Sequence, residues 1–108
     1  SNISLSSHVL DTTLGKPAAN MKLVLTTYDG HVIETQTDDD GRCNNWADFN
    51  FCAGQYCLRF YTQDYLLSLH KEAFYPFVDV NFELKINGGH YHVPLLISPF
   101  GFSSYRGS

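Results

Sequence analysis

Two histidines near the end of the chain are the first residues with the type and spacing for chemistry. His90 and His92 lie two positions apart in a segment that alternates in polarity, so a strand would turn both rings to one face. Imidazole exchanges a proton near neutral pH and is also a common zinc ligand. With His8 as a distant third ligand the pair has the residue types of a zinc site, but the spacing alone favours an interpretation without a metal. Without a metal the two rings are surface or interface histidines that bond to their neighbours.

An acidic run in the middle of the chain, Asp38-Asp39-Asp40-Gly41, has the composition of a calcium loop. With Gly41 at the sixth loop position, however, the twelfth falls on Ala47 instead of the bidentate glutamate of an EF-hand. We therefore interpret the run as a turn that ends a strand, in which Gly41 takes a positive φ. Arg42 follows directly, and by itself it is expected to be a solvated arginine that pairs with the aspartates.

The sequence has no signature of an activated nucleophile. It lacks a G-x-S-x-G elbow, and its three cysteines form no C-x-x-C pair. An odd number of such cysteines (Cys43, Cys52 and Cys57) predicts reduced, structural thiols. Hydrolysis by this chain would therefore use an activated water molecule instead of a covalent intermediate.

The elements that must position these residues are mainly strands. Residues 78–86 alternate apolar and polar side chains, residues 87–89 read Asn-Gly-Gly, and residues 90–97 alternate again, which predicts a hairpin. Further strands are predicted at residues 5–10, 21–28, 31–37, 56–60 and 100–105. One helix is predicted around Tyr65, Leu66 and Leu69, with Thr62 or Asp64 as its cap. This element set indicates an antiparallel β-sandwich with one short helix.

The composition limits the classes of protein and partner. The length of 108 residues predicts one domain, residues 1–108, and a charged fraction of only 17% is typical of a domain that associates with copies of itself. The net charge of −4 and the lack of a basic stripe argue against nucleic acid as a partner. No apolar run approaches the roughly 20 residues that span a membrane. The first residues lack the regions of a secretion signal, so we expect a cytoplasmic protein.

Three blocks of sequence carry a resemblance to a known family. They are Leu5-Ser6-Ser7-His8-Val9-Leu10-Asp11 with Gly15-Lys16-Pro17-Ala18, then Thr37-Asp38-Asp39-Asp40-Gly41-Arg42, then His90-Tyr91-His92-Val93-Pro94-Leu95-Leu96 through Ser98-Pro99 to Tyr105-Arg106-Gly107-Ser108. Together with Phe74-Tyr75-Pro76, these blocks resemble the transthyretin-like 5-hydroxyisourate hydrolases over essentially the whole chain. The ending Tyr-Arg-Gly-Ser separates those hydrolases from the transthyretin hormone carriers, which lack it.

The resemblance implies a fold, an assembly and a reaction. The fold is a transthyretin-like (prealbumin-like) antiparallel β-sandwich of two four-stranded sheets. The assembly is a homotetramer, a dimer of dimers with active sites in a channel between the dimers. The reaction is hydrolytic ring opening of 5-hydroxyisourate to 2-oxo-4-hydroxy-4-carboxy-5-ureidoimidazoline in purine catabolism, downstream of urate oxidation, and it needs neither a metal nor an organic cofactor.

The resemblance also implies site residues. His8 and His92 match the family's paired catalytic histidines, Arg42 its arginine and Ser108 its terminal serine. We expect the two histidines to activate water and Arg42 to stabilise the developing oxyanion. Arg42 and Ser108 are also expected to bind the substrate, with His90 and Tyr105 as further substrate-binding candidates.

Three other functions remain as alternatives on the same fold, because the fold alone does not decide function. The first is a carrier of hormones or other small molecules, which needs no catalytic histidines. The second is a zinc hydrolase built on His8, His90 and His92. The third is a structural or adhesive module, which would turn over no purine derivative.

Overall fold

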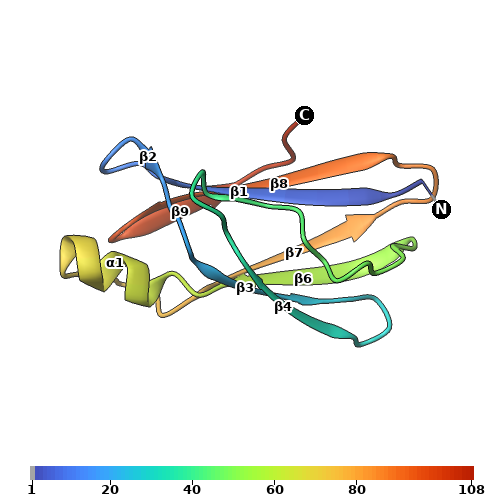
Figure 1. Cartoon of the computed structure of the whole chain (residues 1–108), viewed down its shortest axis with the longest axis horizontal. Helices are drawn as coiled ribbons and strands as arrows, with labels where there is room; N and C mark the ends of the chain where they lie inside the picture. The colour runs from blue at the N-terminus through green and yellow to red at the C-terminus, as the bar shows by residue number, and fades with distance from the viewer. Residues whose placement is uncertain (1) are drawn as a thin grey trace.

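Two β-sheets packed face to face make up the computed structural model, which describes residues 2–108 (Figure 1). Ser1 lies outside the described residues. It belongs to the N-terminal segment that was searched for a secretion signal in the sequence. In chain order the elements are β1 (Ser4–Asp11), β2 (Lys16–Pro17), β3 (Lys22–Thr26), β4 (Val32–Gln36), β5 (Arg42–Cys43), β6 (Gly54–Phe60), α1 (Gln63–His70), β7 (Val78–Leu84), β8 (His90–Ser98) and β9 (Gly101–Ser104).

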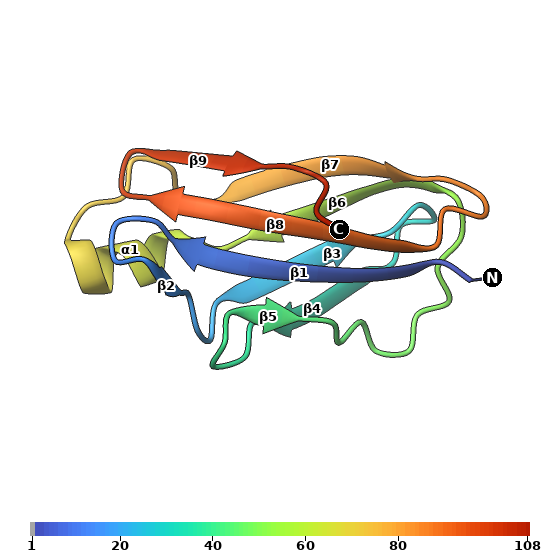
Figure 2. The ribbon, with the colours of Figure 1, turned by 90° about the horizontal axis from the view of Figure 1, so that it is seen from above.

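The first sheet is built around a parallel pair of strands. β1 and β8 run side by side in the same direction from Ser4 opposite His90 to Asp11 opposite Ile97, and β9 pairs antiparallel with β8 (Figure 2). The two short strands β5 and β2 pair with successive parts of the free edge of β1. This sheet therefore contains five strands but is four strands wide, and with its four-stranded partner it confirms the predicted two-sheet sandwich.

The second sheet has the order β4-β3-β6-β7 and is antiparallel throughout. β3 and β4 lie within the strands predicted at residues 21–28 and 31–37 and form a hairpin whose turn contains Asp29 and Gly30, and Gly30 has the positive φ of 88° that such a turn needs. The Thr27 hydroxyl accepts the backbone N–H of His31 at 3.0 Å and donates to Asp29 at 2.6 Å, which closes the turn.

The predicted hairpin of residues 78–97 is wrong, because its two strands lie in different sheets. β7 pairs with β6, whereas β8 pairs with β1 and β9, and residues 85–89 carry the chain across the end of the sandwich (Figure 1). Tyr91 holds this crossing, since its hydroxyl accepts the backbone N–H of Lys85 at 2.9 Å and its ring lies directly against Gly88. Alternating polarity specifies which face of each strand is buried but not which strand lies beside it. Two strands in opposite sheets that face each other across the core show the same pattern as two strands of one hairpin.

The core lies between the two sheets and contains the apolar positions that the alternation predicted. Its fully or almost fully buried side chains include Leu5, Val9, Leu23, Leu25, Leu58, Phe60, Leu84, Leu95 and Ile97. Burial of side chains of this size stabilises a fold by about 1.5–3 kcal/mol each before the entropy cost is subtracted. A rigid sandwich of this kind supplies a firm support for side chains on its outer faces.

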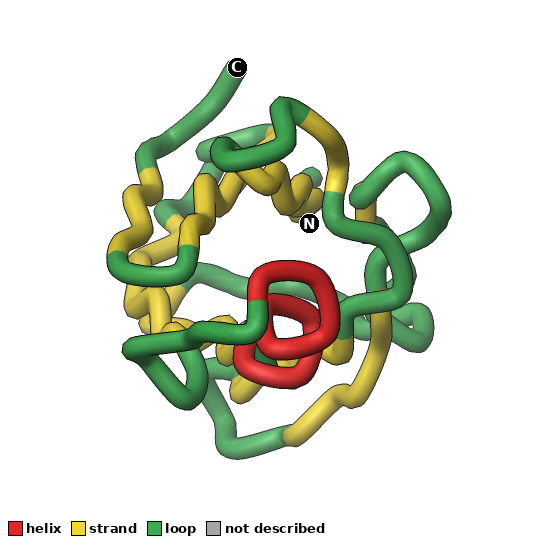
Figure 3. Tube along the Cα trace, turned by 90° about the vertical axis from the view of Figure 1, so that its left-hand side faces the viewer, coloured by secondary structure: helices red, strands yellow, loops and turns green. Residues whose placement is uncertain are grey.

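The predicted helix is present as α1 and covers one end of the sandwich (Figure 3). Leu66 is buried, whereas Leu67 and Leu69 are exposed. Thr62 occupies the N-cap position, but its side chain makes no capping hydrogen bond, so that part of the prediction is wrong. The reason is its backbone, with φ −81° and ψ −22°, since a capping side chain requires an extended N-cap residue. No helix within residues 2–108 is long and apolar enough to cross a membrane.

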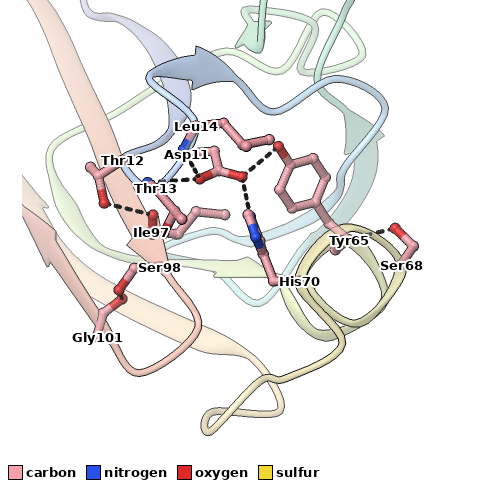
Figure 4. Close-up of polar contacts among 10 residues, drawn as sticks. All are labelled: Asp11, Thr12, Thr13, Leu14, Tyr65, Ser68, His70, Ile97, Ser98 and Gly101. Atoms are coloured by element: carbon pink, nitrogen blue, oxygen red, sulfur yellow. Dashed lines mark hydrogen bonds and ion pairs between the residues drawn. The ribbon is translucent and has the colours of Figure 1, made fainter.

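Asp11 at the end of β1 fastens the helix to the first sheet (Figure 4). One carboxylate oxygen accepts from the Tyr65 hydroxyl at 2.9 Å and the His70 Nε2 at 2.7 Å, both on α1. The other accepts the backbone N–H groups of Thr13 and Leu14. Burial alone would raise the pKa of this carboxyl, but the hydrogen bonds outweigh burial and lower the pKa below its ordinary value.

Candidate active site

The candidate site lies on the outer face of the β1–β8 sheet. In both strands the odd-numbered side chains point into the core, so the even-numbered ones point outward. His8 on β1 and His92 on β8 therefore share this face, and the register sets Ser6 directly opposite His92. Parallel pairing of segments at the two ends of the chain is what brings the histidines together.

Arg42 reaches the same face from the short strand β5. It is paired in register with His8, while its neighbour Cys43 points into the core. The side chain of Arg42 is thus turned outward beside the histidines of β1 and β8. The structure gathers His8, Arg42 and His92 from three separate parts of the sequence.

The turn before β5 fixes Arg42 through the backbone. The Asp38 carboxylate accepts the N–H groups of Asp40 and Arg42, each at 2.9 Å. Gly41 has the predicted positive φ, here 73°, and a Cβ at this position would lie 2.6 Å from the carbonyl oxygen of Val9. The predicted strand-ending turn is confirmed.

The expected pairing of Arg42 with the aspartates is wrong. Within the described part of the chain its guanidinium forms no ion pair, and the Oδ1 atom of Asp38 accepts two backbone N–H groups instead. An arginine without a carboxylate partner keeps its charge and its donors for an anionic or polar ligand.

His8 is oriented by the same turn. Its Nε2 lies 2.9 Å from the backbone carbonyl oxygen of Asp40. A carbonyl oxygen only accepts hydrogen bonds, so Nε2 of His8 carries the hydrogen. In a ring with one hydrogen the other nitrogen, Nδ1, is then a hydrogen-bond acceptor.

His92 is the half-buried histidine of the group. Its Nδ1 lies 2.7 Å from the hydroxyl of Ser6, which leaves Nε2 as its second functional nitrogen. Burial lowers the pKa of His92, and the nearby His8, Arg42 and His90 lower it further. The ring is therefore neutral at pH 7 and able to accept a proton.

His90 lies on the same face, nearer the solvent. Both of its ring nitrogens are hydrogen-bonded to serine hydroxyls of β1, Nδ1 to Ser4 at 2.6 Å and Nε2 to Ser6 at 2.9 Å. Ser4 and Ser6 are polar residues of this face that the sequence interpretation missed. Ser4 and Ser6 can be recognised as partners of His90 and His92 only when the pairing of β1 with β8 is known.

The C-terminal tail is docked against the site and not frayed, as termini usually are. Gly107 forms an antiparallel bridge with His92, three residues after Ser104 on one side and three residues before Leu95, the partner of Ser104, on the other. The tail thus resumes the register of β9 and delivers Ser108 beside His92. The C-terminus stands off the outer face of the β1–β8 sheet (Figures 1 and 2).

Tyr105 is the one candidate that a single chain does not bring to this face. It lines a groove at the edge of the sandwich with Phe82 and Tyr91, side chains that belong to the interior of the two sheets. Arg106 lies in the same groove with its guanidinium 4.1 Å from the centre of the Tyr91 ring. The outer-face group therefore comprises His8, Arg42, His90, His92 and the chain end at Ser108.

The alternative zinc site receives no support from this arrangement. Among residues 2–108, no three His, Cys, Asp or Glu side chains are placed so that they could hold a metal ion. His90 in particular has both nitrogens bonded to serines. Cys43, Cys52 and Cys57 are all free, which agrees with the prediction of reduced thiols.

Comparison with known proteins identifies the family. The model of the HIUase/Transthyretin family matches residues 5–107. The chain belongs to this family. A 5-hydroxyisourate hydrolase of Mesorhizobium japonicum is 45% identical, with 96% of this chain and 91% of the relative covered.

Two solved structures connect the fold to both branches of the family. The 5-hydroxyisourate hydrolase of Klebsiella pneumoniae superimposes with a TM-score of 0.85 at 31% identity, over 97% of this chain and 93% of that chain. Sea bream transthyretin in complex with thyroxine superimposes with a TM-score of 0.84 at 29% identity, over 96% and 94%. The transthyretin-like fold is thus confirmed, and function depends on the residues of the site.

Proposed function

We propose that this protein hydrolyses 5-hydroxyisourate to 2-oxo-4-hydroxy-4-carboxy-5-ureidoimidazoline, without a metal or organic cofactor. The observation that carries the proposal is the pairing of a neutral, half-buried imidazole, His92, with the unpaired guanidinium of Arg42 on one face. A proton acceptor beside a fixed positive charge is what hydrolysis by activated water requires. The names of the hydrolase relatives supply the substrate.

In the proposed reaction, Nε2 of His92 removes a proton from a water molecule as the water oxygen attacks a ring carbonyl. The electron pair of the carbonyl bond moves to its oxygen, and the Arg42 guanidinium stabilises that negative charge. Collapse of the tetrahedral intermediate then breaks the carbon–nitrogen bond of the ring. The leaving nitrogen takes the proton back from Nε2, and the product carries a new carboxyl group.

The remaining candidates have supporting roles in this proposal. His8 has committed its Nε2–H to Asp40, so its Nδ1 holds the water or the substrate. Ser108 lies next to Gly107 beside His92 and positions the ring or the water. His90 and Tyr105 are proposed as substrate-binding residues. Tyr105 would need a neighbouring copy to bring its edge groove next to an outer face.

The homotetramer is proposed for a related reason. The site lies on an open sheet face, and a second copy over that face would exclude water and strengthen the electrostatic effect of Arg42. Large exposed apolar side chains elsewhere on the chain offer further surface for contacts between copies, namely Leu14, Phe74, Phe77, Phe100 and Phe102. The cytoplasm is the proposed location, since three free cysteines suit a reducing compartment.

The carrier function is the second candidate, because sea bream transthyretin with bound thyroxine shares the fold. A site for an apolar hormone does not need a neutral histidine and an unpaired arginine on the same sheet face. A carrier would hold its ligand unchanged, so catalytic turnover separates the two functions directly.

The test is the ultraviolet decay of 5-hydroxyisourate, generated in place by urate oxidase, with and without this protein and in excess chelator. Rapid decay that chelator does not slow is the expected result. Decay at the rate of buffer alone would overturn the hydrolase and leave the carrier. Activity lost to chelator and restored by zinc would contradict the cofactor-free mechanism. His92→Ala and Arg42→Ala variants should each lose most of the turnover, and unchanged rates would refute their proposed roles.

A further inference from the structure

A continuous chain of hydrogen bonds leads away from His92 along the outer face. The Ser6 hydroxyl lies 2.7 Å from Nδ1 of His92 and 2.9 Å from Nε2 of His90. On the other side of His90, its Nδ1 lies 2.6 Å from the Ser4 hydroxyl. The register of β1 and β8 produces this order, since it sets Ser4 opposite His90 and Ser6 opposite His92.

The number of hydrogens available restricts this chain of hydrogen bonds to two directions of donation. A serine hydroxyl has one hydrogen to donate, so Ser6 must donate to one ring and accept from the other. When His92 donates from Nδ1, Ser6 donates to Nε2 of His90, and the Nε2 of His92 is a bare acceptor. When the direction is reversed, Nε2 of His92 carries the hydrogen and becomes a donor. One direction prepares a base and the other an acid.

The two rings differ in how readily they accept a positive charge. His92 is half-buried, and burial, His8 and Arg42 all lower its pKa. His90 is exposed, so a charge on its ring would be in contact with water, whereas a charge on His92 would be half-buried. The guanidinium of Arg106 lies 3.4 Å from the backbone oxygen of His90. When His92 gains a proton, transfer of the positive charge from His92 to the more exposed His90 is therefore favourable.

We propose that Ser6 and His90 form a proton relay that transfers the positive charge from His92 to His90 during attack on the substrate. As Nε2 of His92 takes the water proton, its Nδ1 proton passes to Ser6, and the hydroxyl proton of Ser6 passes to Nε2 of His90. His90 becomes the imidazolium and donates from Nδ1 to Ser4. When the ring nitrogen leaves, Nε2 of His92 gives up its proton and the relay runs back, so every proton returns.

The relay rests on the proposed hydrolase function and assigns new roles within it. Ser6 and His90 are positioning residues that act through His92, and Ser4 orients the His90 ring. A histidine that must serve first as base and then as acid gains both roles without turning its ring. In the relay His90 acts through the serines to which both of its ring nitrogens are bonded, a role separate from the substrate contact proposed for it above.

The kinetic test uses Ser6→Ala, His90→Phe and the double variant. Each single change should lower kcat by about tenfold, less than the hundredfold or more expected for loss of a general base itself. The double variant should lose no more than either single variant, because both break the same relay. Additive losses, or single variants with wild-type kcat, would overturn the relay. Ser6→Thr, which keeps the hydroxyl, should recover most of the rate.

A matched control removes a hydroxyl from the same sheet face outside the relay. Ser103 lies on β9 opposite Leu96, an outward position of β8, so Ser103→Ala should keep the wild-type rate. A proton inventory in mixtures of light and heavy water should be curved for the wild type, with several protons in motion, and linear for Ser6→Ala. Equal curvature in the two proteins would contradict the relay.

A spectroscopic readout separates failure of the relay from failure of the function. The imidazole ¹⁵N shifts report which nitrogen of each ring carries hydrogen, with or without any turnover. His90→Phe should change the tautomer balance of His92, because it removes the hydrogen-bond partner of the Ser6 hydroxyl that contacts Nδ1 of His92, and an unchanged His92 signal would disprove the hydrogen-bonded chain. If 5-hydroxyisourate decays no faster with the wild-type protein than in buffer alone, the proposed hydrolase function is refuted, and the catalytic relay is refuted with it.

Discussion

The backbone N–H of Gly107 donates to the carbonyl oxygen of His92 at 2.8 Å, and the missing side chain of Gly107 leaves room for the His92 ring. A Cβ at residue 107 would lie 2.6 Å from the Cδ2 atom of that ring. The end of the chain and the proposed base are thus packed together. The position and rotamer of His92 depend on a residue only one place from the terminus.

Gly107→Ala should therefore displace His92 or the tail and lower turnover by roughly 10- to 100-fold, since small misplacement of a catalytic group is costly. The melting temperature should change little, because the tail carries few buried contacts. Gly101→Ala is the control, as its Cβ would come no closer than 3.7 Å to a neighbour. Steady-state kinetics and thermal melting of both variants test this, and wild-type turnover in Gly107→Ala would argue against the packing.

The pH dependence of the reaction should follow His92. Because burial and the positive charge of Arg42 lower its pKa, the loss of kcat/KM on acidification should be centred below about 6.5, the ordinary value for histidine. Arg42→Gln removes one of the charges that lower this pKa, so the acid limb should move to higher pH. Turnover should also fall by about a hundredfold as oxyanion stabilisation is lost.

A titration of the His92 ring by NMR provides the direct check on that shift. The charged groups that lower the His92 pKa are His8, Arg42 and His90, so Arg106→Gln serves as the charge-matched control and should leave the pKa nearly unchanged. A His92 pKa that is the same in Arg42→Gln and the wild type would refute the electrostatic coupling.

Asp11→Asn should reduce stability by about 2–3 kcal/mol, because it weakens a buried carboxylate that accepts four hydrogen bonds. The folded-state pKa of Asp11 lies below its ordinary value of 3.8, so its contribution is present above that value and is lost as pH falls through the folded pKa. Unfolding in urea at pH 7 and pH 3 should show a gap between the two proteins that narrows in acid.

Asp79→Asn is the matched control for Asp11. Asp79 pairs with Arg59 at a partly exposed position, where an ion pair contributes about 1 kcal/mol or less. If Asp11→Asn lowers the free energy of unfolding no more than Asp79→Asn does, the hydrogen bonds between Asp11 and α1 contribute little to stability.

Gly41→Ala should affect both stability and activity. The residue has φ 73°, and a Cβ would lie 2.6 Å from the Val9 carbonyl, so the turn that holds Arg42 and the Asp40 carbonyl must shift. Gly30→Ala has a similar φ of 88° with nothing within 4 Å, so it imposes the backbone strain alone, about 1–2 kcal/mol. Kinetics and denaturant unfolding should show turnover lost in Gly41→Ala and retained in Gly30→Ala.

The sequence was most informative where one local rule determines the outcome. Alternating polarity predicted the buried faces of β7 and β8, and the glycine at residue 41 predicted its turn. It was less informative on pairing. A strand pattern does not name its partner, so the hairpin of β7 and β8 was wrong and the parallel pairing of β1 with β8 was not foreseen.

The same limit applies to the candidate site. The resemblance named His8, Arg42, His92 and Ser108, and the structure gathers the first three on one face with the chain end beside them. Ser4 and Ser6 were missed because their role depends on which histidines they lie opposite. The docking of the tail depends on a bridge made outside any regular strand.

The pairing of β1 with β8 also determines when the protein can become active. Hydrogen-bonded partners such as Ser6 and His92 are 86 residues apart in a chain of 108, so the loop that joins them includes most of the molecule. Contacts this distant slow folding, since the entropy of closing the loop is lost before the contacts form. During synthesis β1 has no β8 partner until the residues between the two strands have been made, and an unpaired strand is prone to aggregate in that interval.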